Sequence, residues 1–176
     1  MSDRMAAVVG THLKTLLTLG VLAVLLLVGV TWGWSALTSP FPHKAETKVC
    51  IPTTVGPGDR VAAPKVTISV YNASNTVGLA DRTMAGFENQ GFGAGKVANA
   101  PKGTVVRYAQ IWTHEPQNPA VKLVISRLGP KAHVLGKDPL GPGVTVMVGA
   151  GFDKLFDGRS SVKVTQSAQI CSPPTQ

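Results

Sequence analysis

The chain has 176 residues, of which 44% are hydrophobic, and its formal net charge is +8 at pH 7. This length leaves room for one ordinary domain and a membrane anchor. The apolar fraction, punctuated by many glycines and prolines, excludes a disordered chain and is typical of a compact domain with short connections.

The first feature along the chain is an uncharged apolar run of 23 residues at 15–37. As a helix, such a run spans roughly 34 Å, which is enough to cross a hydrocarbon core about 30 Å thick. The alternatives are a buried core helix, for which the run is too long in so small a protein, and a cleaved signal peptide. Bulky residues at its end, including Trp32 and Trp34, disfavour cleavage and suit an aromatic belt. We therefore predict a short cytoplasmic segment at 1–14 and a transmembrane helix at 15–37.

Basic residues flank this run on both sides, so the positive-inside rule does not decide its orientation. The two cysteines, Cys50 and Cys171, bracket the candidate domain, and neither lies in a C-x-x-C motif. In an oxidising compartment they could form a disulfide, with two unrelated thiols as the alternative. Together with an N-terminal segment too short to fold, this favours a plasma-membrane protein with a cytoplasmic N-terminus and an extracytoplasmic C-terminal domain.

Residues 38–64 are rich in proline, glycine and small polar residues, which predicts an extended extracytoplasmic linker. Beyond them, apolar periodicity alternates between strand and helix. The expected elements are strands at 66–71, 95–99, 104–112, 132–135 and 144–149 and helices at 78–90 and 119–128. Asn75 or Thr76 is the expected N-cap of the first helix, and Gly91 is its expected C-cap. Asn118 is the expected N-cap of the second helix.

This order of elements, β-α-β-β-α-β-β, predicts an α/β (α+β) fold of two layers, with both helices on one face of a mixed sheet. The strands at 95–99 and 104–112 are expected to form a loose hairpin. The tail at 154–176 is expected to contribute an edge strand and to be tied back through the disulfide.

Charge is the next feature of the external part of the chain. From residue 38 onward there are 15 Lys and Arg residues and 8 Asp and Glu residues, a net charge of +7. Such residues often only keep a surface soluble, but they also attract anionic envelope polymers or lipid headgroups. The external location makes nucleic acid an unsuitable partner, although the basic composition alone would favour it.

No catalytic motif in the sequence is complete. The segment GFGAGK at 91–96 has three residues where a phosphate-binding loop needs four, and Val97 follows in place of Ser or Thr. His114 and Glu115 are adjacent, but their spacing from other candidate ligands does not support a zinc or general-base site. We therefore expect no catalytic residue, no metal site and no cofactor.

Three short motifs follow one another in the first half of the domain: Asn72-Ala73-Ser74 after a strand, Gly78-Leu79-Ala80 opening a helix, and Gly91-Phe92 at its end. Together they resemble the LytR C-terminal domain of Gram-positive envelope proteins. Residues 149–153 are similar to its closing motif, except that Gly151 replaces an acidic residue. The resemblance covers 65–153 and implies a stand-alone, membrane-anchored actinobacterial protein of envelope integrity. The glycopolymer transferase domain of LytR-CpsA-Psr proteins has no counterpart here.

The turn that opens the first helix, together with nearby basic residues, is the candidate site for an anionic ligand. Its candidate residues are Asn72, Ser74, Asn75, Gly78, Arg82, Lys96, Lys102 and Arg107. The alternative is a purely structural turn, in which Asn72 and Ser74 bond backbone groups.

The expected function is that of a non-enzymatic, membrane-anchored protein that binds or scaffolds material in cell-wall or envelope maintenance. The alternative is an accessory subunit that modulates a LytR-CpsA-Psr glycopolymer transferase. The expected partners are the membrane and an anionic envelope polymer, a lipid or a transferase protein.

Overall fold

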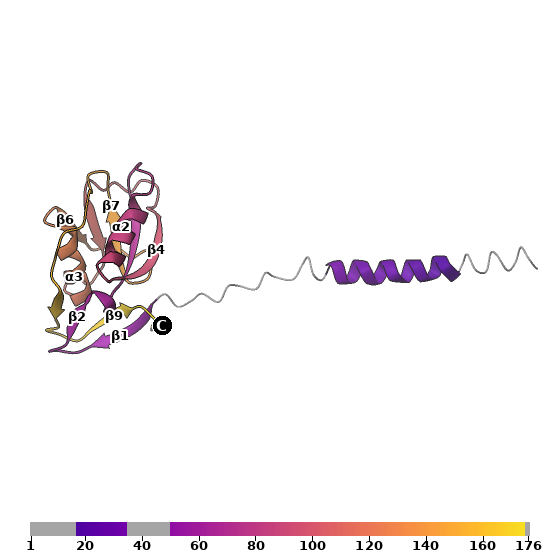
Figure 1. Cartoon of the computed structure of the whole chain (residues 1–176), viewed down its shortest axis with the longest axis horizontal. Coiled ribbons are helices and arrows are strands. Elements are labelled where there is room, and N and C mark those ends of the chain that lie inside the picture. The colour runs from indigo at the N-terminus through magenta and orange to yellow at the C-terminus, as the bar shows by residue number, and fades with distance from the viewer. Residues whose placement is uncertain (1–16, 35–49, 175–176) are drawn as a thin grey trace, which may run out of the picture. The chain divides into compact units, whose positions relative to one another are not determined.

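The computed structural model describes residues 17–34 and 50–174, which belong to two separate units. In the first unit, a helix at Leu17–Trp34 has a mean hydropathy of 2.1 and is long and apolar enough to cross a membrane (Figure 1). A membrane anchor and an N-terminal signal sequence both have these properties. The predicted segment at 1–14, the ends of the predicted helix and linker residues 38–49 lie outside the described residues.

The second unit is built on a five-stranded sheet with the strand order β4-β3-β7-β5-β6. Its elements are β3 (Thr67–Asn72), α2 (Leu79–Asn89), β4 (Gly93–Asn99), β5 (Ala109–Trp112), α3 (Pro119–Leu128), β6 (Ala132–Leu135) and β7 (Val144–Val148). Strand β3 runs parallel to β4 and β7, while β5 runs antiparallel to β7 and parallel to β6. The sheet is therefore mixed, and the predicted fold class is confirmed.

Both helices pack on the same face of this sheet, as expected (Figure 1). Alternate residues of each strand point toward them, and Ile68, Val70 and Val146 are fully buried beneath Phe87 of α2 and Leu123 of α3. Each helix connects two parallel neighbours, β3 to β4 and β5 to β6, which is the crossover that parallel strands require.

The predicted hairpin between the expected strands at 95–99 and 104–112 is wrong. Strand β4 lies at the edge of the sheet beside β3, whereas β5 lies beyond β7, so the two are not neighbours. Residues 104–108 form no strand, and Val106 and Tyr108 instead lie beside Gly149, just past the end of β7. The reason is that a strand that follows a helix pairs most readily in parallel with the strand that precedes the helix. Strand β4 therefore pairs with β3, and β5 pairs with β7 instead.

The face of the sheet opposite the helices is covered by the loop at 136–143. The Tyr71 hydroxyl donates to the carbonyl of Leu140 (2.6 Å), and the Ser69 hydroxyl donates to that of Pro142 (2.7 Å). The backbone N–H of Leu140 donates to the Thr145 hydroxyl (3.1 Å). These bonds satisfy buried polar groups and close a small second core around Tyr71 and Met147.

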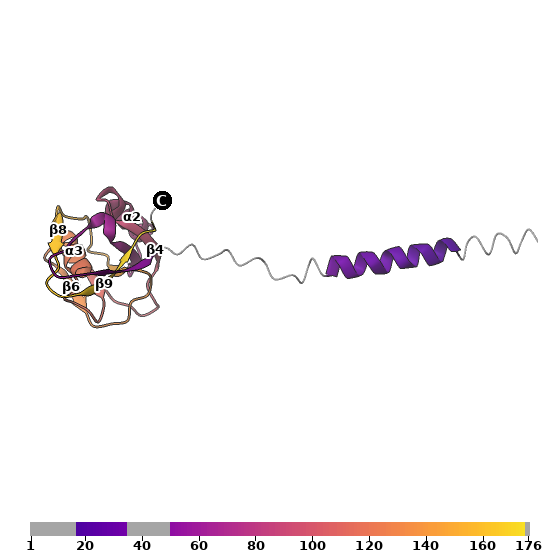
Figure 2. The same cartoon turned by 90° about the horizontal axis from the view of Figure 1, so that it is seen from below.

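Two pairs of short strands tie the beginning of the domain to its end. Strand β1 (Ile51–Val55) pairs antiparallel with β9 (Ala168–Ser172), and β2 (Arg60–Ala62) pairs antiparallel with β8 (Ser161–Lys163). A 3-10 helix, η1 (Ala63–Lys65), leads into β3. Figure 2 shows β1 and β9 side by side.

This arrangement corrects two expectations. The extended linker does not continue to residue 64, and the tail pairs with β1 and β2 rather than with the edge of the main sheet. Each of these strands is only three to five residues long and finds its partner about 100 residues away, so its own sequence does not reveal it. The predicted disulfide joins Cys50 to Cys171, whose Cα atoms lie 5.2 Å apart, at the end of the β1–β9 pair.

Candidate functional site

The turn after β3 is held by its own side chains. The Asn72 carboxamide oxygen accepts from the backbone N–H (2.9 Å) and the hydroxyl (2.8 Å) of Ser74, and its nitrogen donates to the carbonyl of Thr76 (2.8 Å). The Ser74 hydroxyl in turn accepts from the N–H of Thr76 (3.1 Å). The polar groups of Asn72 and Ser74 are thus engaged within the turn, as the structural alternative expects.

Helix α2 begins at this turn without a side-chain cap. Its N-cap is Gly78, which adopts a left-handed conformation with φ +72°, so the expected caps Asn75 and Thr76 are wrong. A non-glycine residue rarely adopts such a φ, which is why the helix opens at a glycine here. Asp81 in the first turn complements the helix dipole.

The end of α2 follows the sequence more closely. Gln90 is the C-cap and Gly91, with φ +85°, stands one position beyond it. The N–H of Phe92 donates to the carbonyl of Phe87 (3.1 Å) and that of Gly91 to Glu88 (2.8 Å), which is a Schellman motif. The rings of Phe87 and Phe92 pack edge to face with centroids 5.4 Å apart.

A first hollow of about 780 Å³ lies between this turn and the segment at 99–106, at the carboxyl ends of β3 and β4. Four candidate residues line it: Asn72, Ser74, Asn75 and Gly78. Asp81 is the one charged residue of its lining, and two valines, Val77 and Val105, are 92% and 88% exposed at its walls. The hollow itself therefore carries no cation that could bind an anion.

The basic candidates lie elsewhere. Arg82 lines a second hollow of about 620 Å³, between α2 and residues 150–155, together with Lys154. Lys96 is exposed in the middle of the edge strand β4, where its N–H donates to the Ser69 hydroxyl (3.0 Å). Lys102 and Arg107 are exposed in the segment that connects β4 to β5. The structure thus separates the predicted turn residues from the predicted cations.

Among the polar residues of the second hollow, the sequence reasoning proposed only Arg82 for the site and missed, for example, Asn89, Gln90 and Lys154. Helical spacing could have found Asn89, because it stands seven residues, about two turns, after Arg82 and so lies on the same face of α2, and Gln90 is the C-cap that follows it. Nothing in the sequence places Lys154 beside them, since it comes from a loop that the tertiary fold brings to α2.

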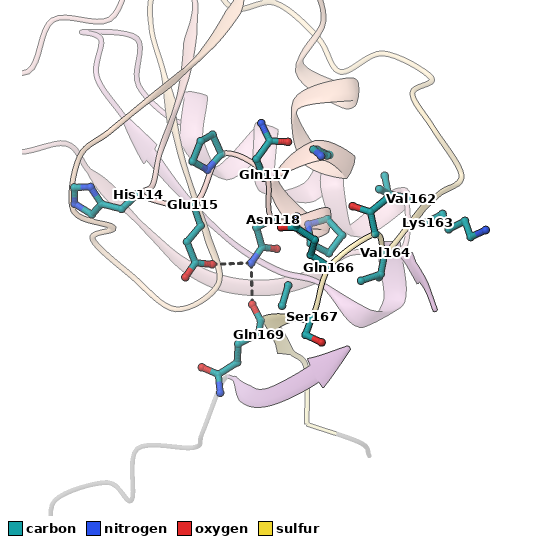
Figure 3. Close-up of a pocket in the computed structure, with 15 residues that line it drawn as sticks. His114, Glu115, Gln117, Asn118, Val162, Lys163, Val164, Gln166, Ser167 and Gln169 are labelled. Carbon is teal, nitrogen blue, oxygen red and sulfur yellow. Dashed lines mark hydrogen bonds between the residues drawn. The ribbon is translucent and has the colours of Figure 1, made fainter. Parts of the chain in front are cut away.

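A third hollow, of about 630 Å³, lies between the start of α3 and the segment at 162–169 (Figure 3). Here the N-cap prediction is confirmed, because the side-chain oxygen of Asn118 accepts from the N–H of Ala120 (3.0 Å). The side-chain nitrogen of Asn118 donates to the Glu115 carboxylate (3.0 Å) and to the carbonyl of Gln169 (2.9 Å). Asn118 therefore joins the start of α3 to β9.

His114 and Glu115 do not act together in this hollow. Figure 3 shows His114 pointing away from Glu115, and its ring nitrogen lies 2.9 Å from the carboxylate of Asp138. Among residues 17–34 and 50–174, no three His, Cys, Asp or Glu side chains are grouped so that they could hold a metal ion.

The pKa values of two tyrosines are raised above the ordinary value for this side chain. Burial raises the pKa of Tyr71 above its ordinary value, since its hydroxyl lies beneath the loop at 136–143. Burial also raises the pKa of Tyr108, and the nearby Asp153 carboxylate raises it further through its charge and a hydrogen bond. The Asp153 carboxylate also accepts from the N–H of Lys154 (3.0 Å).

Comparison with known proteins identifies the family of the domain. The model of a family described as LytR cell envelope-related transcriptional attenuator matches residues 65–152, half of the chain, and this span includes both helices and all five strands of the main sheet. A similar solved structure is the soluble domain of a conserved hypothetical secreted protein from Mycobacterium marinum. It is 19% identical, with a TM-score of 0.47, and the match covers 63% of this chain and 78% of that chain. No curated protein matches. The chain therefore belongs to the family of LytR cell envelope-related transcriptional attenuator domains, as its motifs indicate.

Proposed function

We propose that this chain is a single-pass plasma-membrane protein that holds its LytR-type domain outside the cytoplasm and binds anionic envelope material there without catalysing a reaction. Its role would be to scaffold such material during maintenance of the cell wall or envelope. The family supports the envelope context. The apolar helix at Leu17–Trp34 and the Cys50–Cys171 disulfide support the location, because disulfides persist in oxidising compartments.

One observation carries the binding proposal. Residues 50–174 contain 13 Lys and Arg residues against 7 Asp and Glu residues. Among the described residues, the one ion pair joins His114 to Asp138, so none of these 13 cations is paired with a carboxylate. Unpaired cations in such excess attract polyanions, and the attraction weakens as salt shortens the Debye length from about 10 Å at 0.1 M to about 3 Å at 1 M.

The test uses the full chain in nanodiscs of phosphatidylcholine, titrated with poly(glycerol phosphate) and, as a neutral control, with dextran. The expected result is binding to the polyanion that falls steeply between 0.05 and 0.5 M salt, by about tenfold or more, and no binding to dextran. Binding that does not respond to salt, or equal binding of dextran, would contradict the proposal.

A second candidate function, an accessory subunit that docks on a LytR-CpsA-Psr glycopolymer transferase, is favoured by the two valines of the first hollow. Val77 and Val105 are bulky, almost fully exposed and contributed by two different loops. Exposed apolar side chains that gather at one place are typical of protein contacts. Such a contact would tolerate salt and would fail when both valines are replaced by Asp, whereas binding of the polyanion would not need them.

A further inference from the structure

The second hollow combines an apolar floor with polar walls. Its floor is formed by the buried residues Thr83 and Phe152 and by Leu155, whose Cδ1 would lie 3.0 Å from a Cβ added at Gly86. Any side chain at Gly86 would therefore press on Leu155. Helix α2 forms one wall and residues 150–155 form the other.

Two cations stand on opposite walls of this hollow. Arg82 belongs to α2 and Lys154 to the loop, both are exposed, and neither takes part in an ion pair among the described residues. The one acid of the lining, Asp153, is engaged, because its carboxylate accepts from the N–H of Lys154 and lies beside Tyr108. The local balance thus favours an anion placed between Arg82 and Lys154.

Neutral hydrogen-bonding side chains line the second hollow at both of its ends. Asn89 and Gln90 lie at the far end of α2, and the Gln90 amide nitrogen is held by the carbonyl of Phe156 (3.3 Å). At the near end, Thr76 and Ala150 line both the second hollow and the first, so the two hollows adjoin around the start of α2. A ligand that fits this outline is long, carries hydroxyl groups and places a negative charge between Arg82 and Lys154.

We propose that the second hollow binds a linear anionic glycopolymer, with a phosphate or carboxylate group between Arg82 and Lys154 and hydroxyl groups on Asn89 and Thr76. This inference rests on the proposed function and deepens it, since it assigns the ligand class and the site. The guanidinium of Arg82 matches the paired oxygens of either anion.

The experiment compares variants of the full chain in phosphatidylcholine nanodiscs. The first carries Arg82→Glu and Lys154→Glu, and its matched control carries Arg60→Glu and Lys163→Glu, which also reverses one exposed Arg and one exposed Lys but on the paired strands β2 and β8. Both change the net charge equally, so a general loss of attraction affects them alike. Poly(glycerol phosphate) and polygalacturonate serve as probes, to distinguish phosphate from carboxylate as the anion.

We expect the first variant to bind at least one probe about tenfold or more weakly than the unchanged chain, and the control to lose less than about threefold. The milder pair Arg82→Gln and Lys154→Gln should also weaken binding, which separates loss of the site from loss of the fold. Equal losses in the first variant and the control would overturn the assignment of the site while leaving the proposed function intact. A loss of binding confined to a variant with Lys102→Glu and Arg107→Glu would also overturn the assignment of the site. Failure of the unchanged chain to bind either probe would overturn both the site and the proposed function.

Discussion

At the scale of the residue, the covering loop at 136–143 depends on a glycine. Gly143 has φ +72°, and a Cβ added there would overlap the carbonyl oxygen of Thr67. We expect Gly143→Ala to destabilise the domain by about 2–5 kcal/mol, the sum of a left-handed backbone cost and of overpacking. Gly103 is the matched control, because its φ is +83° but its Cβ would meet nothing within 4 Å. Gly103→Ala should cost only about 1–2 kcal/mol in urea unfolding, and equal effects would contradict the close approach of the loop.

The raised pKa of Tyr71 predicts that the domain becomes less stable at alkaline pH. Its pKa is raised in the folded domain by burial, and its side chain is only 3% exposed. Above the ordinary tyrosine pKa, the unfolded chain loses this proton while the folded domain keeps it, so the free energy of unfolding falls as the pH rises. We expect the urea midpoint to decline above about pH 10, and less steeply in Tyr71→Phe. Tyr108, whose pKa is also raised, preserves part of the decline. An identical pH profile for the two proteins would contradict burial of a neutral Tyr71.

At the scale of the element, two asparagines expected to cap helices have different fates. The side chain of Asn118 caps α3 and also holds Gln169, whereas that of Asn75 makes no cap bond to α2. We expect Asn118→Ala to lower the free energy of unfolding by about 1–2 kcal/mol and Asn75→Ala to change it by less than about 0.5 kcal/mol. Both are measured by urea unfolding, and a large cost at Asn75 would indicate that the turn after β3 needs its side chain.

At the scale of the whole molecule, the disulfide closes the domain. Cys50 and Cys171 are 121 residues apart, so their bond restricts nearly the whole unfolded domain. Removal of the bond by Cys→Ser at either position should lower stability by about 2–5 kcal/mol. Mass spectrometry of the unreduced protein should find the two peptides linked. Free thiols in protein recovered without reductant would remove this support for an external location.

The topology of the whole chain is tested by reporter fusions after Gln176. A reporter that works only outside the cytoplasm should be active there, because the apolar helix would place the domain across the membrane from the N-terminus. Activity of a reporter that requires the cytoplasm would overturn the proposed location. Detection of the full-length chain in the membrane fraction, with its N-terminal residues intact, would distinguish an anchor from a cleaved signal sequence.

The sequence by itself determined what depends on neighbouring residues. Apolar periodicity located β3, α2, β6, β7 and α3 to within two residues at each end, Asn118 and Pro119 marked the start of α3, and short motifs identified the family. The pairing of Cys50 with Cys171 was the one long-range contact that could be inferred, because there were only two cysteines to join.

Only the tertiary structure decided which segments lie side by side. Strands β1, β2, β8 and β9 have weak patterns of their own and exist as strands through partners at the other end of the domain. The residues of the predicted site lie in separate hollows because the tertiary structure decides their neighbours. Asp81 and Arg82, for example, are adjacent in sequence but line different hollows. Successive helical residues point about 100° apart, so Arg82 lines the second hollow together with Lys154 from a distant loop, whereas Asp81 lines the first hollow beside the turn.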